Sequence, residues 1–419
     1  MSDSIKVKPG IAQGSVRIPL SKSYLHRALI CAALAGDMKL ANLGQGELSV
    51  DIEATKACLV KLLDDDSEPV VLNCHESGST LRFLIPLAAA LGRSCTFIGR
   101  GRLPFRPLGE YQRILPESGV AMIFAEEGGA CLPLAIEGQL QAGVFALPGN
   151  VSSQYITGLL LALPLLVGDS QIVLTSPLES EPYVDITIRV MAEFGVAVEK
   201  TERGYRIPGG QKYIRSHKYD SEADYSQAAF WLLMKYLGHP IVIANLPPEN
   251  SVQGDKVVKE ILAKMEALSD SAGGCFSEKG DPSLEVDLSQ CPDLAPALAV
   301  AAAATPCVTR FVNAGRLRIK ECDRLSASCE MLGVLGIETR EEEDSFVVFG
   351  TRVRVESPGF SGGIIRKYED HRMVMASAVA ATCAREAMEI DDYQAVWKSY
   401  PNFFEVLAGL GIAVEKGRG

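Results

Sequence analysis

The chain has 419 residues, of which 47% are hydrophobic and 22% charged, and its formal net charge is −11 at pH 7. This composition is close to the globular average and excludes disordered and fibrous classes, while the length favours two or three domains. The acidic balance argues against nucleic acid or an anionic membrane as the main partner.

The N-terminal decapeptide, MSDSIKVKPG, lacks the apolar stretch of a secretory signal and the Arg- and Ser-rich pattern of a transit peptide. The longest stretch without a polar side chain, residues 158–168, has 11 residues, whereas a membrane-spanning helix needs about 20. The 11 cysteines are scattered without a CxxC pair, which favours reduced thiols. We therefore expect a cytoplasmic protein that has no membrane segment and no structural zinc site.

Six similar segments follow one another, and each runs from a polar start into an Ala- and Leu-rich stretch. They start at Ser21, Ser77, Asn150, Ala223, Pro292 and Asp370. Their spacing divides the chain into six repeats of about 70 residues, which indicates a repeat architecture. Because each stretch is apolar around most of its circumference, we predict six buried helices.

Short β-type runs lie between these helices, so each repeat mixes strands and helices and the fold class is α/β (α+β). The runs cover residues 95–97, 171–174, 240–244, 309–312 and 346–349. The acidic run 339–344 is expected to form a surface turn, and residues 180–185, which contain Pro182, a loop.

Polar residues at the helix starts suggest where ligands bind. Helix N-termini carry partial positive charge and free N–H groups, so converging N-termini would form an anion site. Ser152, Ser153 and Gln154 would add donors to a phosphate there. Asp293 precedes an Ala-rich stretch and is a helix cap, a general base or both.

Basic residues also gather at these boundaries, although each one alone is compatible with a solvated surface charge. They are Lys22, Arg27, Arg106, Arg318, Lys320, Arg324, Arg372 and Lys398. Arginine binds carboxylates and phosphates in a bidentate manner, so the set indicates substrates that carry several anionic groups. Motifs of P-loop ATPases, Rossmann dehydrogenases, α/β-hydrolases and zincins are missing from the sequence.

Six motifs, in chain order, resemble those of the EPSP synthase (3-phosphoshikimate 1-carboxyvinyltransferase) family of enolpyruvyl transferases. They lie at residues 22–27, 149–154, 181–185, 318–324, 370–373 and 398–401. The resemblance implies two domains of three βαβαββ units each, with buried helices whose N-termini face an interdomain cleft. It places residues 1–19 with 224–419 in one discontinuous domain and residues 20–223 in an inserted domain.

The resemblance implies transfer of the enolpyruvyl group of phosphoenolpyruvate to the 5-hydroxyl of shikimate 3-phosphate, by addition and elimination. This is a step in the shikimate pathway to chorismate and the aromatic amino acids. It implies no metal, no redox cofactor and a monomer whose partners are these two small molecules. Asp293 is expected to be the base and Glu321 the proton carrier at C3, with Lys22 as a further catalytic residue.

The same resemblance assigns binding residues. Shikimate 3-phosphate is expected to contact Lys22, Ser23, Arg27, Ser152, Ser153, Gln154, Ser180, Tyr183, Asp293, Arg316 and Lys320. Phosphoenolpyruvate is expected to contact Lys22, Gly78, Arg106, Gln154, Arg324, Arg372 and Lys398. Crowding of so many cations should lower the pKa of a lysine.

The chain departs from the family pattern at Glu76, where an asparagine is usual, and we expect this carboxylate to point away from the site or to pair with Arg82. Arg316 stands where some members carry asparagine. The rival family of UDP-N-acetylglucosamine enolpyruvyl transferases has Lys-Asn in place of Lys22-Ser23. It also usually has Cys or Asp in place of Gly101.

Two more distant alternatives concern other classes of protein. The RNA 3′-phosphate cyclases share part of the architecture, but the acidic charge argues against them. A non-catalytic anion-binding protein would be expected to lose Lys22, Asp293, Glu321 or Lys398, and all four are present.

Overall fold

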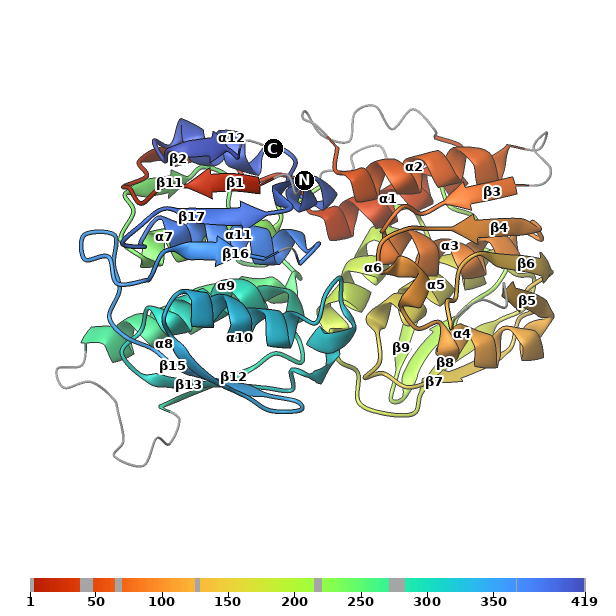
Figure 1. Cartoon of the computed structure of the whole chain (residues 1–419). Coiled ribbons are helices and arrows are strands. Elements are labelled where there is room, and N and C mark those ends of the chain that lie inside the picture. Colours follow the sequence, from red (N-terminus) through yellow and green to blue (C-terminus); the bar gives the residue numbers. More distant parts are fainter. Residues whose placement is uncertain are drawn as a thin grey trace. The chain divides into compact units, whose positions relative to one another are not determined.

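The computed structural model describes residues 4–37, 48–64, 70–124, 129–214, 221–270, 283–366 and 368–417 (Figure 1). The chain divides into two compact units. Residues 1–19 and 223–419 form the discontinuous unit, and residues 20–222 form the inserted unit. That these units are the two domains of the expected fold stays a prediction.

Two βαβαββ repeats follow one another in the inserted unit. The first contains β3 (Val70–Asn73), α3 (Gly78–Ala90), β4 (Cys95–Ile98), α4 (Gly109–Ile114), β5 (Val120–Phe124) and β6 (Leu134–Gly138). The second contains β7 (Val144–Leu147), α5 (Ser153–Ala162), β8 (Ser170–Leu174), α6 (Glu181–Glu193), β9 (Glu199–Thr201) and β10 (Gly204–Ile207). The first two strands of each repeat are parallel, because α3 and α5 provide the crossover that parallel pairing requires.

The two sheets have the same order, β3-β4-β6-β5 and β7-β8-β10-β9. The inserted unit begins with two further helices, α1 (Lys22–Leu34) and α2 (Val50–Leu63). Short 3₁₀ helices connect its elements, namely η2 (Leu103–Phe105), η3 (Pro116–Ser118) and η4 (Leu163–Leu165).

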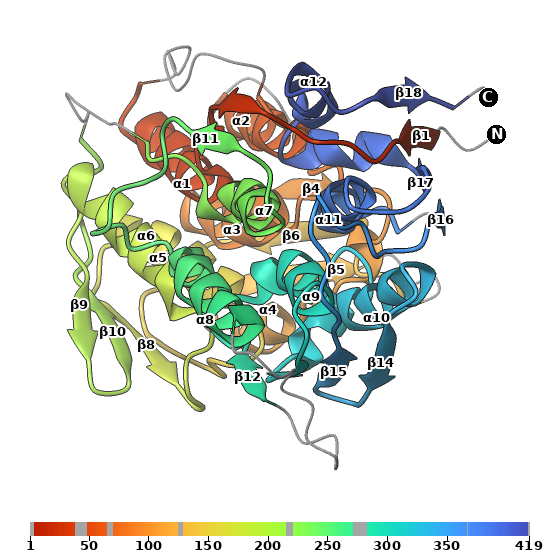
Figure 2. The ribbon, with the colours of Figure 1, turned by 90° about the vertical axis from the view of Figure 1, so that its left-hand side faces the viewer.

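The discontinuous unit repeats this sheet plan twice. One sheet, β12-β13-β15-β14, contains β12 (Leu284–Asp287), β13 (Val308–Val312), β14 (Glu338–Glu341) and β15 (Phe346–Phe349). The other, β16-β17-β1-β18, contains β16 (Gly363–Ile365), β17 (Met388–Asp391), β1 (Ser4–Val7) and β18 (Val414–Lys416). The N-terminal strand β1 thus takes the position that β15 holds in the first sheet, and Figure 2 shows it beside the C-terminal strands.

The helices of the discontinuous unit alternate with these strands. They are α7 (Tyr225–Tyr236), α8 (Val258–Asp270), α9 (Ala295–Ala303), α10 (Arg324–Val334), α11 (His371–Ala381) and α12 (Phe403–Gly409). The 3₁₀ helices are η5 (Gly254–Val257), η6 (Pro292–Leu294), η7 (Gly315–Ile319) and η8 (Tyr393–Lys398). A parallel pair, β2 (Gly14–Val16) and β11 (Ile241–Ile243), accompanies α7.

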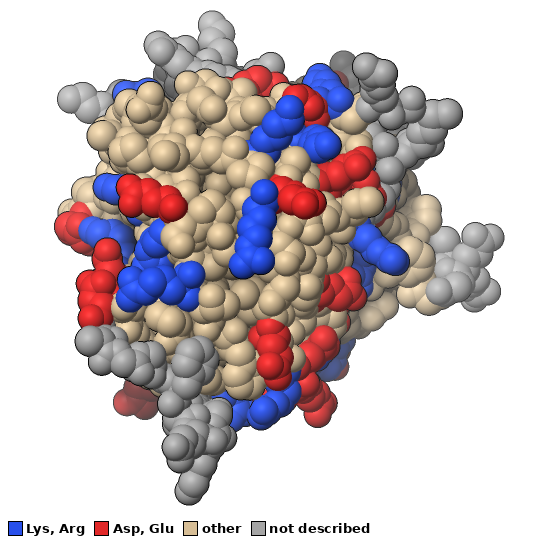
Figure 3. All heavy atoms as spheres, turned by 60° about the vertical axis from the view of Figure 1, so that its left-hand side comes forward, with Lys and Arg blue, Asp and Glu red and all other residues tan. Residues whose placement is uncertain are grey.

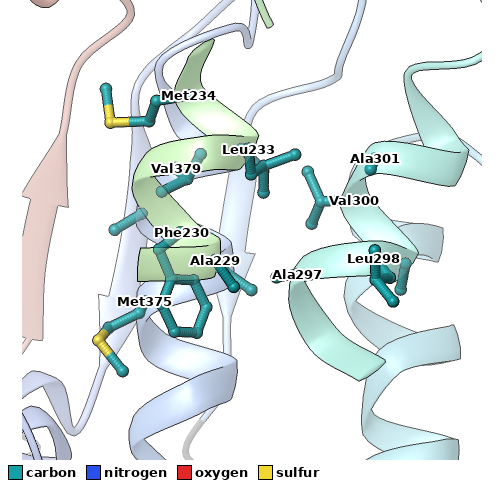
Figure 4. Packing of buried hydrophobic residues seen from close by; sticks show 14 of the residues in the cluster. Ala229, Phe230, Leu233, Met234, Ala297, Leu298, Val300, Ala301, Met375 and Val379 are labelled. Atoms are coloured by element: carbon teal, nitrogen blue, oxygen red, sulfur yellow. The ribbon is translucent and has the colours of Figure 1, made fainter. Parts of the chain in front are cut away.

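The predicted buried helices are α1, α3, α5, α7, α9 and α11, and the predicted mixed fold class is confirmed. Every residue of α9 and of α11 is buried. Figure 4 shows Leu233 of α7 pointing toward Val300 of α9, with Met375 and Val379 of α11 in the same layer. Removing this apolar surface from water stabilises the unit by about 25 cal/mol per Å².

Two expectations about local structure need correction. Residues 180–185 are not a loop, because Ser180 is the N-cap of α6 and Pro182 lies in its first turn, where proline is tolerated. The first residues of the acidic run 339–344 lie in strand β14, which ends at Glu341. The turn is formed by the residues between β14 and β15. The helix that follows the polar start at Asn150 begins at Ser153 with Ser152 as its N-cap, in agreement with the hydroxyls expected at this helix N-terminus.

Acidic and basic side chains are interspersed on the face of the molecule in Figure 3. No helix among the described ranges is long and apolar enough to cross a membrane. None of the ten cysteines in those ranges forms a disulfide, and nine of them are buried.

Candidate active site

Charged side chains converge within the discontinuous unit at η6, just before and at the start of α10, and at the start of α11. The group contains Asp293, Lys320, Glu321, Arg324, Asp370 and Arg372. The three cations face three carboxylates, and this buried pairing offsets the desolvation cost of each charge.

Arg324 lies at the centre of this group, and its side chain is only 1% exposed. Nη1 donates to Oδ1 of Asp293 at 2.8 Å, and Nη2 donates to Oε2 of Glu321 at 2.7 Å. Nε donates to Oδ2 of Asp370 at 2.7 Å. One guanidinium therefore holds the predicted base and the predicted proton carrier in fixed positions.

Asp293 is bridged by two arginines. Besides Arg324, Arg372 donates from Nη2 to Oδ2 of Asp293 at 2.7 Å, and Nζ of Lys320 lies 3.6 Å from Oδ1. Burial by itself would raise the pKa of Asp293, but Arg372, Lys320 and Arg324 together hold that pKa well below its usual value. The carboxylate is therefore ionised, and it is a poor proton acceptor while both arginines hold it.

The structure resolves whether Asp293 is a helix cap. The N-cap of α9 is Leu294, and the carboxylate of Asp293 binds arginines. Asp293 is therefore an ion-paired residue rather than the N-cap of α9.

Asp370 binds Arg324 and the backbone of Arg372 through its side chain. It is fully buried, caps α11 by accepting from the backbone N–H of Arg372 at 2.8 Å, and also accepts from Arg324. The sequence marked Asp370 only as a helix start, and its partnership with Arg324, 46 residues away, needed the structure.

Lys320 is the lysine with a lowered pKa in this group. Burial lowers the pKa of Lys320 to about 8; Arg324 and Arg316 also lower it, whereas Asp293 and Glu321 oppose the shift. Neighbouring cations thus lower the pKa of Lys320 as expected, but burial lowers it more.

The remaining predicted cations of this unit differ in surroundings. Arg316 donates to the carbonyl of Ser289 at 2.6 Å, and Lys398 donates to the carbonyl of Glu369 at 2.6 Å. Arg318, from the same basic segment, binds Asp323 and Glu341, which makes it a structural residue.

In the inserted unit, Lys22 begins α1 and its Nζ lies 2.8 Å from Oδ2 of Asp51 in α2. Sequence reasoning missed Asp51, which lies in the acidic first turn of a helix that no motif marked. The ion pair holds the predicted catalytic lysine at the start of its helix.

Arg27 connects α1 to α6. It donates from Nη1 to the carbonyl of Ser23 at 2.6 Å, from Nη2 to the carbonyl of Tyr183 at 2.9 Å, and from Nε to Oγ1 of Thr187 at 2.6 Å. Four of the residues predicted to bind shikimate 3-phosphate lie at these two helix starts, namely Ser23, Arg27, Ser180 and Tyr183.

Ser152 and Ser153 open α5, and Ser152 caps it by accepting from the N–H of Gln154 at 3.3 Å. The side-chain amide of Gln154 donates to Oγ of Ser79 at 3.1 Å. The predicted phosphate cradle and the start of α3 are therefore linked directly.

Gly78 lies against two arginines. A Cβ atom at this position would stand 2.5 Å from Nη1 of Arg106 and 2.9 Å from Nη1 of Arg82, so glycine is required for their close approach. Arg82 was expected only as a partner of Glu76, but it binds Gln154 and Pro107, and Glu76 lies 3.8 Å from Arg100.

The predicted site residues thus form two groups. The discontinuous unit holds Asp293, Arg316, Lys320, Glu321, Arg324, Arg372 and Lys398, and the inserted unit holds Lys22, Ser23, Arg27, Gly78, Arg106, Ser152, Ser153, Gln154, Ser180 and Tyr183. Each group combines hydroxyls or carboxylates with cations, an arrangement that can bind anions and transfer protons. Within the described ranges, no cluster of three or more His, Cys, Asp or Glu side chains could hold a metal ion.

Comparison with known proteins agrees with this chemistry. Residues 40–407 match the family model described as EPSP synthase (3-phosphoshikimate 1-carboxyvinyltransferase). A 3-phosphoshikimate 1-carboxyvinyltransferase of Clostridium acetobutylicum is 40% identical over 427 residues, with 97% of each chain covered. The protein of the same name from Clostridium kluyveri is 40% identical, with 98% of each chain covered.

A solved structure of EPSP synthase from Acinetobacter baumannii has a similar fold. Its TM-score is 0.74 at 22% identity, with 99% of this chain and 100% of that chain covered.

Proposed function

The chain belongs to the EPSP synthase family, and from this membership we propose how its residues carry out the family's reaction. The chain is a transferase that moves the enolpyruvyl group of phosphoenolpyruvate to the 5-hydroxyl of shikimate 3-phosphate and releases phosphate. The reaction belongs to the biosynthesis of the aromatic amino acids.

The observation that carries the assignment of roles is the shared contact of Arg324 with Asp293 and Glu321. Addition requires a base that takes the proton of the 5-hydroxyl while its oxygen bonds to C2 of phosphoenolpyruvate, and an acid that protonates C3. Elimination then breaks the bond from C2 to the phosphate oxygen and removes a proton from C3. We assign the first task to Asp293 and the C3 proton to Glu321.

Phosphoenolpyruvate carries a phosphate and a carboxylate, and its proposed ligands are cationic. They are Lys22, Arg106, Arg324, Arg372 and Lys398, with Gly78 and Gln154 beside them. Because Arg324 and Arg372 already pair with Asp293, the bound anion competes for both guanidiniums. This competition raises the pKa of Asp293 toward a range in which it can accept a proton.

For shikimate 3-phosphate, we propose that Ser23 and Arg27 bind the carboxylate. Ser152, Ser153, Ser180 and Lys320 bind the phosphate, because hydroxyls at helix N-termini and a cation are suited to an anion. Tyr183, Gln154 and Arg316 line the ring. Lys22 serves both substrates and, as the third proposed catalytic residue, stabilises the charge that develops at the transferred group.

The experiment measures phosphate release from phosphoenolpyruvate with shikimate 3-phosphate as acceptor, and separately with UDP-N-acetylglucosamine. Wild-type protein is compared with Asp293→Asn, which keeps the size of the side chain and removes the base. Release with shikimate 3-phosphate alone, reduced about 10²- to 10⁴-fold in the variant, supports both the reaction and the role of Asp293.

Release only with the nucleotide sugar would assign the chain to the rival acceptor. Release with shikimate 3-phosphate that Asp293→Asn leaves unchanged would keep the reaction and reject Asp293 as the base.

We further infer that the enzyme works in the cytoplasm as a monomer. Light scattering coupled to size-exclusion chromatography tests the oligomeric state. A mass near 45.0 kDa would support the monomer, and a mass near twice that value would reject it.

A further inference from the structure

Arg82 is a buried arginine of the inserted unit that none of the assigned roles uses. It lies in α3, one helical turn after Gly78, and is 3% exposed. Its guanidinium lies 5.4 Å from the ring centroid of Tyr155, in cation–π contact.

The guanidinium of Arg82 binds two parts of the proposed substrate site, namely Gln154 and the backbone next to Arg106. Nη1 donates to Oε1 of Gln154 at 2.9 Å, and Nη2 donates to the carbonyl of Pro107 at 2.9 Å. These acceptors belong to α5 and to the segment that follows η2, so one side chain joins three elements.

The contact with Gln154 sets the orientation of its amide. A guanidinium can only donate, so the amide oxygen of Gln154 faces Arg82. The amide nitrogen then faces Oγ of Ser79 and donates to it at 3.1 Å. Without Arg82, either end of the amide could face Ser79.

The contact with Pro107 fixes the backbone next to Arg106. The same carbonyl accepts from the hydroxyl of Tyr155 at 2.5 Å, and Sγ of Cys131 donates to the carbonyl of Arg106 at 3.1 Å. Because Nη1 of Arg106 approaches Gly78 closely, a small shift of this backbone would displace its guanidinium.

The charge of Arg82 gives a second reason to expect a functional role. Its hydrogen-bond acceptors are a neutral amide and a neutral carbonyl, and its Nε has no hydrogen-bond partner within the described residues. A buried charge in such surroundings costs free energy. An anion bound near Gly78 would offset part of that cost.

We infer that Arg82 is a positioning residue that holds the amide of Gln154 and the backbone of Arg106 in the arrangement that binds phosphoenolpyruvate. The inference rests on the proposed function of Gln154 and Arg106. It adds a residue that acts through both of them.

Arg82→Lys tests the inference because lysine keeps the charge but cannot hold both acceptors with a planar fork. We expect the KM for phosphoenolpyruvate to rise about ten- to a hundredfold, the range for hydrogen bonds to charged groups. The kcat should change much less. Arg113→Lys is the matched control, because Arg113 of α4 also donates to a backbone carbonyl but lies outside the site.

Two further variants separate the contacts. Tyr155→Phe removes the other donor to Pro107 and should raise the same KM by a smaller factor. In a Gln154→Ala background, Arg82→Lys should raise the KM less than in the wild-type background, because one of its two targets is gone.

Three outcomes would overturn the inference. The first is an unchanged KM in Arg82→Lys, and the second is a fall in kcat that is accompanied by a lower melting temperature. The third is full additivity of Arg82→Lys with Gln154→Ala. If Arg82→Lys does not fold, Arg82 is a structural residue and the inference fails. The wild-type rate is measured in the same series, so a failure of the proposed function would appear there as no phosphate release.

Discussion

Nη1 of Arg324 donates to Oδ1 of Asp293 at 2.8 Å, so the proposed base is already ion-paired before substrate binds. The two residues are 31 positions apart, and Arg372 reaches the second oxygen of the same carboxylate. Breaking a buried ion pair by removing one partner leaves uncompensated charge and costs about 3–5 kcal/mol.

We therefore predict that Asp293→Ala destabilises the ligand-free protein by roughly this amount. Inorganic phosphate should restore part of the loss, because it supplies negative charge to Arg324 and Arg372. Urea denaturation with and without phosphate measures both effects, and the wild-type protein is the control. A variant as stable as wild type, with an equal response to phosphate, would contradict the prediction.

The second prediction concerns Lys320, because burial lowers its pKa to about 8. Its ammonium is charged below this pH and loses its proton above it, so its attraction for a phosphate weakens as the pH rises. We expect the dissociation constant of shikimate 3-phosphate to increase toward tenfold per pH unit above about 8. Titration calorimetry at pH 7, 8, 9 and 10 measures it.

Lys320→Arg provides the matched control for this titration, because arginine stays charged over the whole range. The variant should bind shikimate 3-phosphate with a flat dependence between pH 8 and 10. Identical slopes in the two proteins would assign the pH dependence to another group.

The third prediction uses the close approach of Gly78 and Arg106. A methyl group in Gly78→Ala would meet Nη1 of Arg106 at 2.5 Å and Nη1 of Arg82 at 2.9 Å, so both guanidiniums must move. The backbone of Gly78 does not need glycine for its φ, and alanine favours helix, so the backbone itself should tolerate the substitution. We expect an approximately tenfold higher KM for phosphoenolpyruvate, about the loss of one ordinary hydrogen bond.

Gly109→Ala is the control for this substitution. Gly109 is also the first residue of a helix, and an added Cβ there would meet nothing within 4 Å. It should leave the KM unchanged. An equal KM in both variants and wild type would show that Arg106 does not depend on this contact.

The buried helices could be predicted from the sequence because their signal is local. A capping residue followed by an Ala- and Leu-rich stretch marks α1, α3 and α11 directly. The same local reading failed at Ser180, because a proline signals a loop and a first helical turn equally well. The pairing of β1 with β17 joins residues more than 380 positions apart, and no local pattern encodes it.

The candidate site could be predicted only where a residue type identified its chemistry, and its roles stay predictions. Arg318 and Arg324 lie in one basic segment, yet Arg318 turns to Glu341 and Arg324 to Asp293. The two arginines have different partners because of the path that the chain takes between η7 and α10. Spacing in the sequence does not predict this path. The partners of Arg82 and of Lys22 were missed for the same reason, since Gln154 and Asp51 lie in other elements.

The last prediction concerns Asp255, a buried residue of η5 that accepts a hydrogen bond from Ser226. Burial and the nearby carboxylates of Asp293 and Asp224 raise the pKa of Asp255 to about 7, although Arg372 and Ser226 act in the opposite direction. The folded protein therefore keeps a proton that the unfolded chain releases above about pH 4. Stability should fall as the pH rises from about 4 to 7, and this part of the fall should level off above 7.

Asp255→Asn removes the titrating group and keeps its shape. We expect the melting temperature of the variant, relative to wild type, to increase steadily between pH 4 and 7 and then to stay constant. Contributions of other titrating groups cancel in this difference as long as the variant leaves them unchanged. A difference in melting temperature that stays constant from pH 4 to 7 would show that Asp255 is ionised in the folded protein. The charge of Arg372 would then outweigh the effect of burial on its pKa.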